Sequence, residues 1–66
     1  MKAFDLVTPE MIVARLDEWD ARTWDDVRGY WMEYRAALGD EATKTFKEFA
    51  WGIAAQNLLF DALEAA

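Results

Sequence analysis

The stretch TWDDVRGYWMEYRAALG, residues 23–39, decides the fold. Its apolar residues recur at alternating spacings of three and four, as in a helix that packs on another helix; they are Trp24, Val27, Trp31, Tyr34 and Leu38. Thr23 and Asp26 form a pair like a capping box and are expected to open this helix. Gly39 is a natural stop. We predict a helix over 24–38.

The residues before this stretch predict another helix. Thr8 is a favourable N-cap, and Pro9 suits the first helical position because the missing N–H has no helical partner there. Three apolar residues then share one helix face: Ile12, Leu16 and Trp19. We predict a helix over 9–20, preceded by a lead-in segment over 1–7.

The residues after Gly39 predict a third, longer helix over 41–65. This segment has no proline and is rich in good helix formers, and Asp40 is placed to cap it. Gly52 is its weak point, because a glycine inside a helix costs about 1 kcal/mol relative to alanine. The helix either continues through Gly52, allowing close approach of a neighbour, or is kinked or divided there. Apolar residues on two of its sides indicate a central position or contact with another chain.

Together these segments predict an all-α fold, a compact three-helix bundle formed by residues 1–66 as a single domain. Short connections favour antiparallel neighbours, so we expect the second helix to run back along the first and the third back along the second. A chain of 66 residues buries only about 60% of its unfolded surface, so its core must be dense. We expect the large rings at helical spacing to supply that core; they are Trp19, Trp24, Trp31, Tyr34, Phe46 and Phe49.

The composition excludes several kinds of chemistry. The chain has no Cys and no His, which removes disulfides and the usual zinc ligands. It also has no Ser, so the familiar nucleophile–base pairs cannot form. We therefore expect no enzyme activity, no cofactor and no metal. A net charge of −6 argues against direct binding to nucleic acid or to anionic membranes. Neither a signal peptide nor a membrane span is recognisable, so we expect a cytoplasmic protein.

The predicted topology gathers negative charge at one end of the bundle. This acidic pole consists of Asp17, Glu18, Asp20, Asp25, Asp26, Asp61 and Glu64. Helix dipoles and solubility explain many such acids without any further function. Alternatively, carboxylates one helical turn apart, at about 5–6 Å, imitate a row of phosphates. In size, charge and helicity the chain resembles phage-encoded nucleic-acid mimics, anti-CRISPR proteins among them. This resemblance of type, without a shared motif, implies an inhibitor that docks on a basic, nucleic-acid-processing protein.

Two groups of apolar side chains support an alternative function. Tyr30 and Trp51 lie off the main apolar faces, whereas Leu58, Leu59 and Phe60 lie where the longer third helix is expected to extend beyond the other two. The predicted apolar interface consists of Tyr30, Trp51, Leu58, Leu59 and Phe60. Through it the chain would act as a helical homo-oligomeric structural or assembly protein. Residues 31–38, WMEYRAAL, are similar to the W-x-x-Y-R-x-x-L stretch of some phage tail assembly chaperones. Both a monomer and a homodimer remain open.

Overall fold

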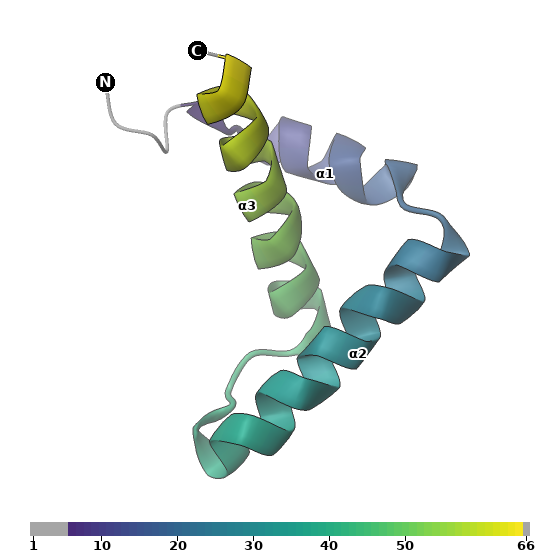
Figure 1. Ribbon diagram of the computed structural model, residues 1–66, viewed down its shortest axis with the longest axis vertical. Helices are drawn as coiled ribbons and strands as arrows, with labels where there is room; N and C mark the ends of the chain where they lie inside the picture. Colours follow the sequence, from purple (N-terminus) through teal and green to yellow (C-terminus); the bar gives the residue numbers. More distant parts are fainter. Residues whose placement is uncertain (1–5, 66) are drawn as a thin grey trace.

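The computed structural model describes residues 6–65 and contains three α-helices in that range. They are α1 (Pro9–Glu18), α2 (Ala21–Leu38) and α3 (Phe46–Ala65), with a short 3₁₀ helix, η2 (Gly39–Glu41), between α2 and α3 (Figure 1). The fold is an all-α three-helix bundle, as predicted. Of the predicted lead-in, residues 1–5 lie outside the described residues.

The third helix connects the other two. Figure 1 shows α1 and α2 diverging from their short connection, while α3 lies against both. The C-terminal half of α3 packs on α1, and its N-terminal half packs on α2. The expectation that α2 would run back along α1 is therefore wrong. α1 and α2 both pack their apolar faces against α3, which is apolar on more than one side.

The first two helices have side-chain N-caps. The Thr8 hydroxyl accepts a hydrogen bond from the Met11 backbone N–H at 3.3 Å, as expected of an N-cap. α1 ends at Glu18, two residues earlier than predicted. The N-cap of α2 is Asp20, because its carboxylate accepts from both the backbone N–H and the hydroxyl of Thr23, each at 2.8 Å. Thr23 thus lies in the first turn, and its predicted role as N-cap is wrong.

The predicted start of α3 is also wrong. Gly39 ends α2 in a positive-φ conformation (φ 56°) that suits glycine, as predicted, but Asp40 then enters η2 and caps nothing. α3 begins at Phe46 behind a reciprocal capping box: the Glu48 carboxylate accepts the Thr45 N–H at 3.0 Å, and the Thr45 hydroxyl accepts the Glu48 N–H at 3.2 Å. The helix continues undivided through Gly52.

The core is aliphatic and small, whereas the sequence predicted an aromatic core. Among residues 6–65 the buried side chains are Ile12, Val27, Ala50, Ala54 and Leu58. On α3 they follow a spacing of four residues, so one line of small side chains faces the neighbouring helices. The cluster of Ile12, Ala54 and Leu58 is flanked by half-buried Val7, Leu16, Trp19 and Ala55.

The aromatic rings instead form a half-buried layer between α2 and the start of α3. Trp24 stacks edge-on against Trp19, with ring centroids 4.9 Å apart, and also against Phe46, at 6.0 Å. Trp31 lies 5.5 Å from Phe46, and the rings of Tyr34 and Phe49 lie 5.4 Å apart. Because α1 and α2 diverge, one side of this layer faces solvent. The rings therefore stabilise the contact without being enclosed by it.

Candidate functional site

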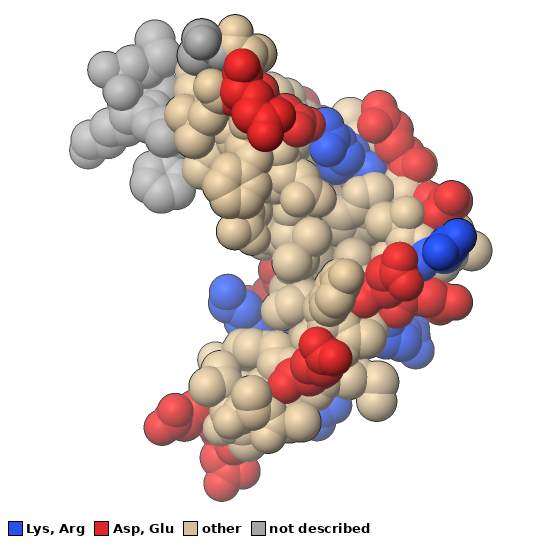
Figure 2. All heavy atoms as spheres, in the orientation of Figure 1, with Lys and Arg blue, Asp and Glu red and all other residues tan. Residues whose placement is uncertain are grey.

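The seven predicted acidic residues are all exposed. Asp17 and Glu18 end α1, Asp20 caps α2, and the others lie on α2 and α3. On the face that Figure 2 shows, Asp and Glu side chains, drawn without regard to the predicted set, extend along the whole molecule, with basic side chains among them.

Arg15 brings together two of the predicted acids. Its Nη2 lies 3.0 Å from Oδ2 of Asp61 on α3, and its Nε lies 3.8 Å from Oε2 of Glu18 one turn along α1. Arg15 is not among the site residues predicted from the sequence. The i,i+3 spacing to Glu18 could have indicated the weaker contact. The contact with Asp61 depends on how α1 crosses α3, which the sequence pattern does not specify.

The Asp20 carboxylate is already engaged in hydrogen bonds as the N-cap of α2. The backbone N–H of Thr23, and then the Thr23 hydroxyl, donate to its carboxylate and lower the pKa of Asp20 from its ordinary value of 3.8. A carboxylate held in this way is a poor candidate for a mobile contact with a partner. The remaining exposed acids of the predicted set are Asp17, Asp25, Asp26 and Glu64.

These four carboxylates have no cationic neighbour within 4.0 Å among residues 6–65, where every ion pair uses Arg15. Two arginines of α2 lie over aromatic rings instead. The Arg28 guanidinium is 5.3 Å from the ring centroid of Phe46, and that of Arg35 is 5.0 Å from Trp31. Because these cations contact the aromatic layer, the carboxylates on the surface of the described residues stay largely unneutralised.

The predicted apolar interface is divided by the fold. Tyr30, Trp51 and Phe60 are exposed, and Phe60 has a relative accessibility of 53%. Leu58 belongs to the core with Ile12 and Ala54, so its side chain is not available to a partner. Leu59 is half-buried and faces a groove. The spacing of Leu58 from Ala50 and Ala54 could have indicated its place in the core.

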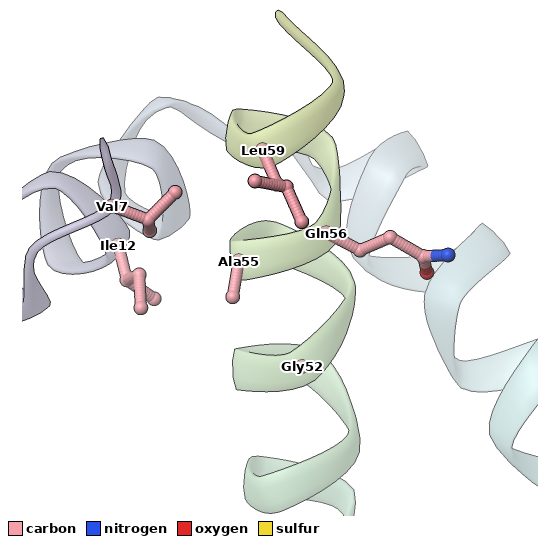
Figure 3. A pocket seen from close by; sticks show the side chains of 6 residues that line it. All are labelled: Val7, Ile12, Gly52, Ala55, Gln56 and Leu59. Carbon is pink, nitrogen blue, oxygen red and sulfur yellow. The ribbon is translucent and has the colours of Figure 1, made fainter. Parts of the chain in front are cut away.

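An apolar groove runs between the start of α1 and the side of α3 that carries Gly52, Ala55 and Leu59. It has a volume of about 410 Å³ and is lined by Val7, Ile12, Gly52, Ala55, Gln56 and Leu59. In Figure 3, Val7 and Ile12 lie on one side and face Ala55 and Leu59, whereas the Gln56 side chain extends away from them. Gln56 is the only polar residue of this lining. The groove therefore suits an apolar occupant.

Two kinds of feature are absent from residues 6–65. No group of three or more metal-ligating side chains among residues 6–65 is placed to hold a metal ion. Within the same residues no helix combines the length and the apolar character needed to cross a membrane. No protein-family model, curated protein or solved structure significantly matches the chain. The likeness to nucleic-acid mimics and to tail assembly chaperones thus gains no support from these comparisons.

Proposed function

We propose that the protein is a non-catalytic binding module that inhibits a nucleic-acid-binding protein by docking carboxylates on its basic surface. The observation that carries this proposal is the set of exposed carboxylates that have no cationic neighbour among residues 6–65, Asp17, Asp25 and Asp26 above all. A partner rich in Lys and Arg would supply the missing cations. Such a partner also implies action in the cytoplasm, without direct contact between this acidic chain and nucleic acid.

Long-range attraction supports the same function. A net charge of −6 on 66 residues steers the chain toward a positive surface and raises the rate of encounter. Salt screens such attraction, so binding is expected to weaken as ionic strength rises. Glu18 and Asp61 contribute less, because Arg15 already contacts both. Asp20 contributes less because it caps α2.

Affinity capture with charge-reversed variants tests this function. The wild-type chain is expected to retain nucleic-acid-binding proteins from a cell lysate at low salt and to release them at high salt. The double variant Asp25→Lys, Asp26→Lys should retain at most about a tenth as much, because two favourable contacts become repulsive. The matched control is Glu33→Lys, Asp40→Lys, which makes the same change of charge at exposed positions elsewhere. Equal retention by both double variants would contradict the proposed surface.

A further inference from the structure

The apolar groove between α1 and α3 is lined but not filled by residues 6–65. Its volume is about 410 Å³, and Val7 and Ile12 on one side face Ala55 and Leu59 on the other (Figure 3). Residues 49–60 of α3, FAWGIAAQNLLF, contain no Asp, Glu, Lys or Arg, so this part of the helix offers a charged occupant no partner. A polar group would lose its water and gain few hydrogen bonds, and an apolar side chain is therefore the best occupant.

The chain enters α1 at the wall of this groove. Thr8 is the N-cap of α1, so Val7 directly precedes the cap and Ile12 is the fourth residue of the helix. Apolar side chains at these two positions pack as a hydrophobic staple, which fixes the angle at which the chain enters the helix. Val7 packs against the buried cluster that contains Ile12, and Leu6 beside it is also half-buried. The residues before Leu6 therefore start from a fixed point beside the groove.

The five residues before Leu6, MKAFD, lie outside the described part of the chain and carry one aromatic side chain, that of Phe4. Phe4 is three residues before Val7, so its Cα lies within about 11 Å of the Val7 Cα even when the chain between them is extended. A phenylalanine side chain removes roughly 150–250 Å² of surface from water when it is buried. Ala66, at the other end, carries only a methyl group. Phe4 is thus the large apolar side chain with the shortest tether to the groove.

We propose that Phe4 occupies this groove, so that residues 1–5 form a strap across the start of α1 and the middle of α3. The ring then lies between Ile12 and Leu59 and covers the apolar walls that these residues form. The tether favours this occupant over a separate molecule, because a short flexible linker gives an effective concentration in the millimolar range. A second copy or a partner at micromolar concentration is about a thousandfold more dilute.

Isotope-filtered NMR on the full chain locates the ring directly. Nuclear Overhauser contacts are expected between the Phe4 ring and the methyl groups of Ala55 and Leu59, which lie far from it in sequence. A sample that mixes labelled and unlabelled chains should show these contacts within one chain only. Contacts between chains would overturn the strap in favour of a second copy. Absence of any contact between the Phe4 ring and α3 would overturn it in favour of an outside ligand.

Unfolding equilibria measure how much the ring contributes. Phe4→Ala should raise the equilibrium constant for unfolding by about tenfold or more, because the apolar surface that the ring buries is lost. The matched control Phe60→Ala removes the same side chain from an exposed position of α3 and should change the constant by no more than about threefold. Equal effects of the two substitutions would overturn the proposal.

A double-mutant cycle assigns this contribution to the groove. Phe4→Ala and Leu59→Ala should be coupled, so that together they raise the unfolding constant by at least about threefold less than the product of their separate effects. Phe4→Ala and Tyr30→Ala, the latter at an exposed position of α2, should act independently. Independent action of Phe4 and Leu59 would overturn the strap.

Salt and charge distinguish the strap from the proposed function. Packing of an uncharged ring in an apolar groove should change little with salt, whereas docking of carboxylates on a basic protein should weaken. Phe4→Ala leaves the net charge of −6 unchanged, so capture of a basic partner should persist at low salt. The double variant Asp25→Lys, Asp26→Lys should lose that capture and keep the contacts of Phe4 with α3. Either proposal can therefore fail without the other.

Discussion

The two contacts of α3 differ in what stabilises them. Its contact with α1 is aliphatic: Ile12, Ala54 and Leu58 are buried together, and the Arg15–Asp61 ion pair lies at the edge. Its contact with α2 is mainly aromatic, and the rings keep one side toward solvent. Burial thus dominates the first contact, whereas ring geometry and hydrogen bonds contribute more to the second.

Polar atoms of the aromatic layer also hold the segment between η2 and α3. The indole N–H of Trp31 donates to the backbone carbonyl of Lys44 at 3.1 Å, and the Tyr34 hydroxyl accepts from the Lys44 N–H at 3.3 Å. These bonds satisfy backbone groups of an irregular segment that has few helical partners. The α2 contact therefore positions the start of α3, while the α1 contact encloses its middle.

Breaking the aliphatic contact should have the largest effect. Leu58→Ala removes a buried side chain and leaves a cavity, so it should lower the free energy of unfolding by about 2–5 kcal/mol. Leu38→Ala, at the exposed end of α2, is the matched control and should change it by no more than about 0.5 kcal/mol. Urea denaturation followed by tryptophan fluorescence measures both. Similar values for the two variants would show that the aliphatic cluster does not dominate.

Removing a hydrogen bond of the aromatic layer while keeping its ring packing should have a smaller effect. Trp31→Phe retains a ring beside Phe46 but removes the N–H that reaches Lys44, so the loss should be about 1 kcal/mol. Trp51→Phe, on an exposed ring of α3, should lose less than about 0.5 kcal/mol. Thermal unfolding of both variants gives the comparison. A larger loss for Trp51→Phe would contradict the assigned hydrogen bond.

The ion pair at the edge of the aliphatic contact should contribute still less. A double-mutant cycle with Arg15→Met and Asp61→Asn should give a coupling of about 0.2–1 kcal/mol, since both side chains are partly solvated. The longer Arg15–Glu18 pair should give a smaller coupling. Both couplings should fall as salt is added. A coupling that salt does not change would indicate a pair shielded from solvent.

The helix caps add a small dependence on pH. Hydrogen bonds from Thr45 lower the pKa of Glu48 from its ordinary value of 4.5, as those from Thr23 do for Asp20. A lowered folded-state pKa contributes stability above the unfolded-state pKa, and this is lost as pH falls through the folded-state pKa. Stability should therefore decline below pH 4.5. Glu48→Gln should reduce that slope, which urea titrations at several pH values measure; an unchanged slope would contradict the role of this cap.

Helix ends could be predicted from the sequence more reliably than the packing of the helices. Thr8, Pro9 and Gly39 mark real helix ends, because caps and stops depend on neighbouring residues alone. The T-x-x-E pattern of Thr45 and Glu48 is an equally clear N-terminal signal for α3. Asp40, directly after Gly39, is a second potential cap and favours a start five residues too early. Two potential caps so close together compete, and the one with reciprocal hydrogen bonds prevails.

The core and the site were harder to predict, because both depend on how the helices pack against one another. Ala50 and Ala54 are buried because small side chains let α3 approach its neighbours, whereas size alone favoured the tryptophans. The exposure of the acidic residues followed from their chemistry. Their distribution, and the pairing of Arg15 with Asp61, depend on the angle at which helices cross. A pattern of apolar residues specifies a face but not that angle.

The central claim is that the acidic surface occupies a nucleic-acid-binding surface of its partner. The most direct test adds duplex DNA to the complex of this protein with a captured partner and measures both ligands on that partner. The account predicts mutual exclusion: DNA displaces the acidic chain, and the chain reduces DNA binding in proportion to its occupancy. A stable ternary complex, with both bound at undiminished affinity, would contradict it.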